Sequence, residues 1–335
     1  MSWLWAVFTV AASGGQVLRN AMQKELTATL GTVGATQVRF LFGLPFALAF
    51  LSIVLAMTQL PLPTLNPLMI AWTVTGAVTQ IGGTALLLAV MQQRSFVVTT
   101  AYVKTEPVHV AIFGLIFLGD PVTPALAMAI VIATGGVLII SWPRRGSAEV
   151  FSWKAAGLGL ASGALFAIAA IGFRGGIRAL DSPSFLVGAT ATLVLGLIIQ
   201  VVTLSAYLII ADRTTLYAIA RAWQPSLSAG FMGAFASQMW FLAFALETAA
   251  KVRTLALVEI LFAQVVSHNL FKQSLASREA AGIVLIVAGV VLRTCDGRLF
   301  ARPGAERRAP RTSRGAPIAS GAELPITARV ARPSL

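Results

Sequence analysis

Ten apolar stretches, each long enough to cross or nearly cross a lipid bilayer, recur along this chain. A helix needs about 20 apolar residues to span roughly 30 Å of hydrocarbon. Prolines, glycines and charged residues separate the stretches, which occupy residues 3–22, 33–57, 67–92, 96–118, 123–142, 153–173, 184–210, 224–246, 251–271 and 277–295. Because backbone polar groups must be satisfied within lipid, this pattern predicts an all-α integral membrane protein with ten transmembrane helices.

The overall composition supports the same class. Of the 335 residues, 57% are hydrophobic and 11% are charged, whereas soluble domains carry about 25% charged residues. The single cysteine, Cys295, excludes an internal disulfide. One Cys and two His do not supply the four ligands of a structural zinc site. We therefore expect no metal and no cofactor.

The C-terminal segment has a different composition from the rest of the chain. From Asp296 to the end it has eight Arg against three acidic residues, with many Ala, Pro and Gly. It has no hydrophobic periodicity, so we expect residues 297–335 to form a disordered basic tail. Such a tail could bind nucleic acid, but attraction to anionic lipid headgroups explains it more simply. We expect a lipid partner and no nucleic acid.

An internal repeat divides the membrane region into two parts. Residues 105–140 can be placed over residues 258–293 with an offset of 153, so that Glu106 falls on Glu259 and Asp120 on Gln273. Both copies consist of a glutamate, an apolar helix, a short polar turn and a second apolar helix. The repeat predicts two five-helix units, residues 1–146 and 147–296. Five is an odd number, so the units are inverted, as in many secondary transporters.

These residues resemble the EamA-like family of the drug/metabolite transporter superfamily. The first copy, "TEPVHVAIFGLIFLGDPVTPALAMAIVIATGGVLII", has the family's Glu-Pro step at Glu106-Pro107, with Asp120 at the turn position. The second copy keeps Glu259 but has Ile260 instead of Pro. "VRFLFGLPFAL" (38–48) and "MWFLAFALE" (239–247) are similar to the family's second and eighth helices.

The resemblance implies a function as well as a fold. It implies a multi-pass permease of the cell (inner) membrane with both termini in the cytoplasm. It implies a secondary transporter that exports a small metabolite, amino acid or drug by alternating access, with protons or another ion as possible coupling partners. No phosphate-binding loop of the GxxxxGK[ST] kind is present. A membrane-embedded enzyme, or a sensor or scaffold without transport, is the alternative; no paired catalytic motif favours an enzyme.

Glu106 and Glu259 are the most informative residues of the membrane region. An ionised side chain at mid-bilayer costs about 2.5–3.5 kcal/mol on insertion scales, so embedded carboxylates usually line a cavity or have a protein partner. The repeat brings the two residues to equivalent positions. We expect them to bind a cationic or zwitterionic substrate or to carry a coupling proton. The alternative is a structural role in which both carboxyl groups bond to backbone and fix helix packing.

Other polar residues within the apolar stretches complete the predicted binding site. Lys104 either lines the cavity or pairs with a distant carboxylate. His109 follows Glu106 by three residues and shares its helix face, as a proton relay or as a hydrogen-bonded packing residue. The resemblance implies that helices one, three and eight surround the substrate path, and the polar residues on these helices are Gln16, Asn20, Gln80 and Gln238. Hydrogen bonding between helices is the alternative role for them.

The basic residues give no independent indication of orientation. Lys and Arg divide almost evenly between the two sets of predicted loops, when Arg19, Arg174 and Arg253 are counted as loop or helix-end residues. Arg39 stands near the start of the second stretch, where we expect it to extend toward the lipid headgroups. The family resemblance alone therefore places the termini in the cytoplasm.

Overall fold

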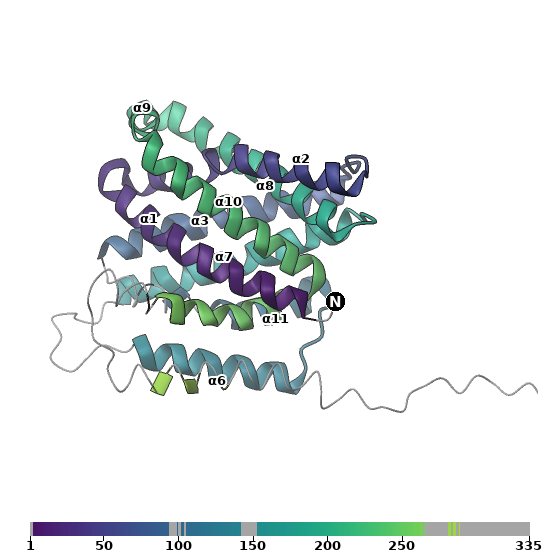
Figure 1. Cartoon of the computed structure of the whole chain (residues 1–335). Helices are drawn as coiled ribbons and strands as arrows, with labels where there is room; N and C mark the ends of the chain where they lie inside the picture. The colour runs from purple at the N-terminus through teal and green to yellow at the C-terminus, as the bar shows by residue number, and fades with distance from the viewer. Residues whose placement is uncertain are drawn as a thin grey trace, which may run out of the picture.

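The computed structural model describes residues 3–93, 99, 102–103, 105–141, 153–263, 265, 281–282, 284–285 and 288. These residues are 89% helical and include no strand, which confirms the all-α class. The helices lie side by side in one bundle, with α6 at one edge and α9 at the opposite corner (Figure 1). The elements are α1 Leu4–Leu41, α2 Leu44–Thr58, α3 Pro67–Gln93, α5 Glu106–Phe113, η1 Gly114–Leu118, α6 Pro124–Ser141, α7 Trp153–Ala179, α8 Phe185–Ala211, α9 Arg213–Arg221, α10 Trp223–Leu246, α11 Ala249–Leu255 and η2 Ala256–Val258.

Several of these helices are long and apolar enough to cross a membrane. Within the described residues there are five such segments, Leu4–Thr58, Pro67–Gln93, Trp153–Ala179, Phe185–Ala211 and Trp223–Leu246. Glu106–Leu118 and Pro124–Gly136 are shorter apolar helices in the fourth and fifth predicted spans. Three predicted features lie outside the described residues. They are most of the predicted span 277–295, the boundary between the repeats at residues 146 and 147, and the basic tail 297–335. The chain is a multi-pass membrane protein, and its total of ten helices remains a prediction.

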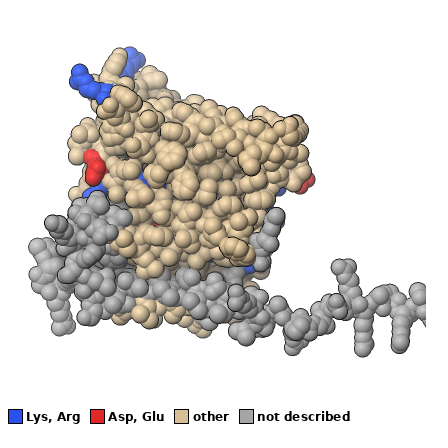
Figure 2. Space-filling model, viewed as in Figure 1, with Lys and Arg blue, Asp and Glu red and all other residues tan. Residues whose placement is uncertain are grey.

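The outer surface of the bundle is apolar. Large hydrophobic side chains on α2 and α8 are exposed, among them Met57 and Ile210, which are 77% and 86% exposed. Figure 2 shows a face with few charged side chains, most of them near its edges. A surface of this kind is unfavourable in water and favourable against lipid chains.

The first two predicted spans lie in α1 and α2, and α1 itself is kinked at one glycine. Gly31 has φ 66° and ψ 178° inside α1, a conformation that side-chain-bearing residues rarely adopt. Leu4–Thr58 is therefore 55 residues long without being one straight helix. A second break follows at Phe42 and Gly43, and Pro45 lies in the first turn of α2, where it needs no hydrogen-bond partner.

The connection predicted between the seventh and eighth spans is itself partly helical. Residues 213–221 form α9, and the Asp212 side chain accepts a hydrogen bond from the Thr215 backbone N–H at 3.3 Å. Asp is a favoured residue for this capping position. This cap favours a short helix within the segment "DRTTLYAIARAWQP", which separates the seventh and eighth apolar stretches.

Close backbone contact joins α3 to α7. A Cβ atom built on Gly172 would lie 2.7 Å from the backbone nitrogen of Gly76, and one built on Gly175 would lie 2.6 Å from the Trp72 ring. Without side chains at Gly172 and Gly175, the two helix axes can approach closely, as small residues allow in membrane helices. This contact holds the middle of α3 against the middle of α7, and both helices line the buried cavity described below.

Gly172→Ala is expected to destabilise the bundle by about 1–3 kcal/mol, because the added methyl group meets backbone rather than a movable side chain. Gly157→Ala, on the same helix, is the matched control. A Cβ there would have nothing within 4 Å, so the change should be neutral or stabilising by about 0.5–1 kcal/mol. Thermal unfolding of both purified variants measures the difference. Equal unfolding temperatures would contradict the proposed close contact.

Candidate functional site

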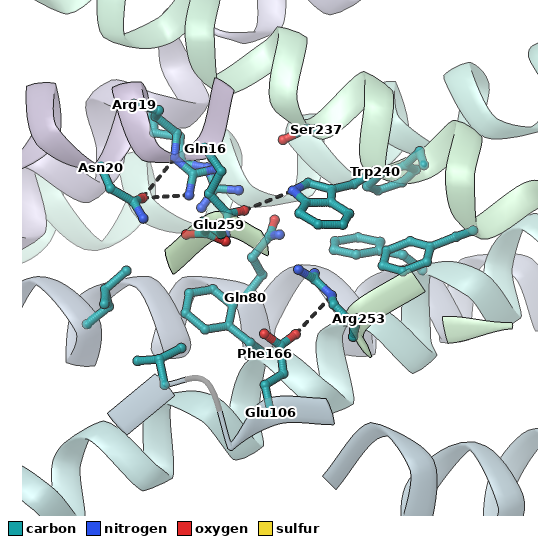
Figure 3. Close-up of a pocket in the computed structure, with 16 residues that line it drawn as sticks. Gln16, Arg19, Asn20, Gln80, Glu106, Phe166, Ser237, Trp240, Arg253 and Glu259 are labelled. Atoms are coloured by element: carbon teal, nitrogen blue, oxygen red, sulfur yellow. Dashed lines mark hydrogen bonds and ion pairs between the residues drawn. The ribbon is translucent and has the colours of Figure 1, made fainter. Parts of the chain in front are cut away.

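A buried polar cavity lies between helices that are far apart in the sequence (Figure 3). α1, α3 and α5 contribute residues from the first half of the chain, and α7, α10, α11 and the helical residues after η2 contribute residues from the second half. The lining residues are Gln16, Arg19, Asn20, Arg39, Gln80, Leu87, Val103, Glu106, Phe166, Phe173, Ser237, Trp240, Phe241, Phe244, Arg253 and Glu259. The cavity thus combines charged, amide and aromatic side chains inside an apolar bundle.

Glu106 lies at the start of α5, where the helix is interrupted. Thr105 is in a turn, and Pro107 stands in the first helical turn, a position that its fixed φ and missing N–H suit. The Oε1 atom of Glu106 lies 2.9 Å from the Nε atom of Arg253 on α11, and both side chains are at least nine-tenths buried. The carboxylate is therefore compensated by a cation from the other half of the chain.

Arg253 also contacts two aromatic rings. Its guanidinium carbon lies 4.3 Å from the centre of the Trp240 ring and 5.3 Å from that of Phe244. A guanidinium over an aromatic face gains a cation–π interaction, which is larger where water is excluded. Together with Glu106, these rings hold the charged end of Arg253 inside the cavity.

Glu259 belongs to a chain of hydrogen bonds on the other side of the cavity. It follows the 3-10 turn η2, so this carboxylate also stands beside a helix irregularity. Gln16 Nε2 donates to Glu259 Oε2 at 2.8 Å, and Trp240 Nε1 donates to Gln16 Oε1 at 2.9 Å. Glu259 is 1% exposed. The chain of bonds fixes the orientation of the Gln16 amide and, through it, the carboxylate.

Two further arginines lie in the same cavity. Arg19 donates from Nη2 and Nε to Asn20 Oδ1 at 2.7 and 3.3 Å. Arg39 donates from Nη1 to the Thr84 hydroxyl at 3.1 Å. Their side chains are buried, with 2% and 3% exposure. In Figure 3, Arg19, Asn20, Gln16 and Glu259 gather on one side, Glu106 and Arg253 on the other, and Gln80 between them.

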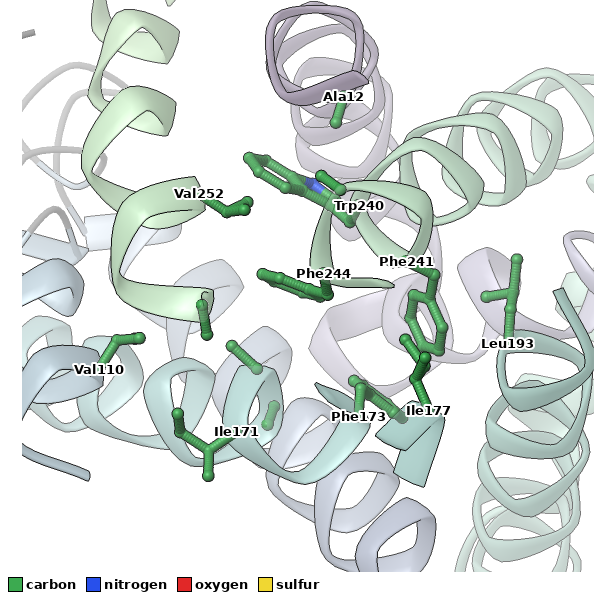
Figure 4. Close-up of a cluster of buried hydrophobic side chains, with 14 of the residues drawn as sticks. Ala12, Val110, Ile171, Phe173, Ile177, Leu193, Trp240, Phe241, Phe244 and Val252 are labelled. Carbon is green, nitrogen blue, oxygen red and sulfur yellow. The ribbon is translucent and has the colours of Figure 1, made fainter. Parts of the chain in front are cut away.

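The aromatic wall of the cavity continues into the apolar core. The rings of Phe173 and Phe241 lie 4.7 Å apart between centroids, and those of Trp240 and Phe244 lie 6.2 Å apart. Figure 4 shows these rings gathered with aliphatic side chains such as Ile177 and Val252. The cavity volume is about 30 Å³, which is room for about two water molecules. In this conformation the cavity is therefore too small for an organic solute.

The structure brings five of the predicted site residues to this cavity: Gln16, Asn20, Gln80, Glu106 and Glu259. Two others lie elsewhere. Gln238 donates to the Thr190 hydroxyl at 2.8 Å and so bonds α10 to α8, which is the predicted alternative for an amide between helices. The ring nitrogen Nδ1 of His109 lies 3.1 Å from the carbonyl oxygen of Thr105, one turn earlier in its own helix. Lys104 lies outside the described residues.

The cavity arginines are the main correction to the sequence analysis. Arg39 was expected near the lipid headgroups, and Arg19 and Arg253 were counted with the loops. Instead, α1 continues past Arg19, and only Glu247 and Thr248 separate α10 from α11, so these side chains remain deep in the bundle. Arg174 is also buried, where it binds Asp120 with Nε–Oδ2 and Nη2–Oδ1 distances of 3.1 Å each. The sequence signal that could have identified Arg19, Arg39 and Arg253 as cavity residues is their position on helices that form the cavity.

The fold and the buried polar cavity define a helical membrane protein with an enclosed site near the centre of its bundle. Residues 2–142 match the model of the EamA-like transporter family, a family of the drug/metabolite transporter superfamily. The match confirms the resemblance described above. Members of the family transport small solutes across membranes and are not enzymes.

One solved structure, described only as a crystal structure of a protein, has the same fold. It superposes with a TM-score of 0.67 at 13% sequence identity, over 90% of this chain and 98% of that one. At this identity the likeness concerns the fold alone. A search of curated proteins found no match to the chain.

Proposed function

We propose that this protein is a secondary transporter that moves a small organic solute across the cell membrane by alternating access. The observation that carries the proposal is the charged cavity, built from both halves of the chain within an apolar, membrane-spanning bundle. Burying Arg19, Arg39 and Arg253 with two carboxylates is unfavourable without a role for them. Binding a polar solute within the membrane is such a role.

The packing of the helices supports two inverted repeats of five helices, residues 1–146 and 147–296. If the second repeat is placed on the first in chain order, α1 corresponds to α7, α3 to α10, and Glu106 at the start of α5 to Glu259 after η2. The pair α1–α10 then exchanges with the pair α7–α3, and these are the two most extensive helix contacts among the described residues. α5, which begins at Glu106, also packs against α11, which precedes η2 and Glu259. A twofold axis in the membrane plane explains this pattern.

The narrow cavity supports alternating access. With room for about two waters, the described conformation holds the site closed around its own side chains. Both carboxylates stand beside helix irregularities, at the start of α5 and after η2. Interrupted helices next to charged residues are typical of sites that open by movement of one repeat against the other. We propose export as the direction, proton coupling through Glu259, and cytoplasmic termini in the inner membrane.

Glu259→Gln is expected to lower the rate of solute flux by about tenfold or more, since the change removes the charge from the hydrogen bond with Gln16. Solutes that raise the unfolding temperature of the purified protein are first identified, and their flux is then measured in reconstituted vesicles with and without a pH gradient. Glu25→Gln is the matched control at an exposed position. Unchanged flux and pH response in Glu259→Gln would contradict the role of Glu259. Absence of flux for every stabilising solute would contradict the transporter.

A further inference from the structure

Positive charge exceeds negative charge among the described residues that line the cavity. The guanidinium groups of Arg19, Arg39 and Arg253 face the carboxylates of Glu106 and Glu259. Glu106 is in direct contact with Arg253, and Glu259 lies on the side of Arg19 (Figure 3). If all five groups are ionised, one positive charge remains, and it belongs to Arg39.

Arg39 contacts neutral groups, and no carboxylate pairs with it among the described residues. Its Nη1 atom donates to the neutral Thr84 hydroxyl, and its guanidinium carbon lies 5.1 Å from the centre of the Phe40 ring. Its Nε atom is buried without a hydrogen-bond partner, as is one terminal nitrogen of Arg19. Two of the other charged residues that line the cavity with it, Arg19 and Arg253, are also cations. A buried cation in these surroundings needs an anion.

The fold makes room for these two arginines. A Cβ atom built on Gly233 of α10 would lie 3.2 Å from Arg39 Cγ and 3.5 Å from Arg19 Cδ. The absent side chain of this glycine lets both stems pass between α1 and α10. Their charged ends reach the cavity beside its aromatic wall. Donor groups and an apolar surface are thus presented together to whatever enters.

We propose that the transported solute is an organic monoanion whose carboxylate binds Arg39 with help from the neighbouring Arg19. A guanidinium offers paired N–H donors that match the two oxygens of a carboxylate. A net charge of −1 neutralises the excess among the described cavity residues, and the rings of Phe166, Phe173 and Phe241 accept the apolar part of the solute. This assignment rests on the proposed transport function, since it identifies the cavity as the transport site. It replaces the cationic or zwitterionic solute expected from the two glutamates alone.

The test is binding to the purified full-length protein. A panel of small aliphatic and aromatic monocarboxylates is measured by thermal unfolding and calorimetry, each beside the primary amide and the primary amine of the same carbon skeleton. We expect only carboxylates to bind. Arg39→Gln should weaken their binding by about tenfold or more, and Arg39→Lys, which keeps the charge but not the paired donors, should have a smaller effect. Without ligand, Arg39→Gln should unfold at a higher temperature, because it removes an uncompensated charge.

Two results would overturn the assignment: no carboxylate in the panel binding at millimolar concentration, or amides or amines binding as well as their carboxylates. Carboxylate binding that is unchanged in Arg39→Gln would also overturn it. Vesicle flux separates this assignment from the transport proposal. Arg39-dependent binding without flux would refute transport and leave the anion site in place. Flux of a cation, unaffected by Arg39→Gln, would support transport and refute the anion assignment.

Discussion

Arg253→Gln is expected to be among the most destabilising single substitutions in this protein, with a loss of about 3–5 kcal/mol. The substitution leaves the Glu106 carboxylate buried without the cation that now lies 2.9 Å from it. It also removes the guanidinium from the faces of Trp240 and Phe244. The loss is measured as a fall in unfolding temperature in detergent. Transport should fall with it, because the cavity loses its link between α5 and α11.

Substitution of the partner residue, Glu106→Gln, should lower the stability less than Arg253→Gln. In Glu106→Gln, Arg253 keeps its contacts with both rings and can still donate to the new amide oxygen. In the double variant Glu106→Gln/Arg253→Gln neither residue of the pair carries a charge, and two amides can bond to each other, so much of the stability should return. This order, with Arg253→Gln least stable and the double variant more stable than it, is the signature of an ion pair. Strictly additive losses would show that the two residues act independently.

Lys251→Gln provides the matched control on the same helix. Lys251 Nζ lies 3.0 Å from Glu247 Oε1, at nearly the same separation as the Glu106–Arg253 pair. Its side chain is 26% exposed and that of Glu247 is 23% exposed. A partly solvated pair between neighbouring turns of the chain contributes about 0–1 kcal/mol. A loss for Lys251→Gln as large as that for Arg253→Gln would mean that burial is not the cause.

The two glutamates could be found from the sequence, but their partners could not. Glu106 and Glu259 stand out because each interrupts an apolar stretch and because the repeat aligns them. Gln16, Asn20 and Gln80 stand out for the first of these reasons. An arginine near a predicted helix end looks the same whether it reaches lipid headgroups or turns inward. The difference depends on side chains from other helices, such as Thr84 for Arg39 and the Trp240 ring for Arg253.

Helix-face arguments were also limited by local backbone geometry. His109 shares a face with Glu106 by spacing, but its ring is directed back to the Thr105 carbonyl at the start of the same helix. Gln238 lies one residue after the cavity residue Ser237 and two before Trp240, and that rotation directs it to α8. The fold class depends on hydropathy, which is averaged over many residues. The site depends on the direction in which each side chain points from its helix axis. This direction cannot be predicted when the helix boundaries are uncertain by a few residues.

Arg174→Gln is expected to cause a loss of similar size, about 3–5 kcal/mol, through a different arrangement. Arg174 on α7 binds both oxygens of Asp120, and its Nη1 atom donates to the carbonyl oxygens of Phe244 and Glu247 at 3.0 and 2.7 Å. The last carbonyls of a helix lack partners within the helix. One side chain therefore joins the turn after η1 to α7 and to the end of α10.

Arg178→Gln is the control for this prediction, because Arg178 also approaches Asp120, at 3.6 Å, but its side chain is 55% exposed. Its loss should be below about 1 kcal/mol. Asp120→Asn should fall between the two, since it leaves Arg174 its two carbonyl acceptors and an amide oxygen. Thermal unfolding of the three variants gives the order directly. If Arg174→Gln were no less stable than Arg178→Gln, the end of α10 would have to be held by its apolar contacts alone.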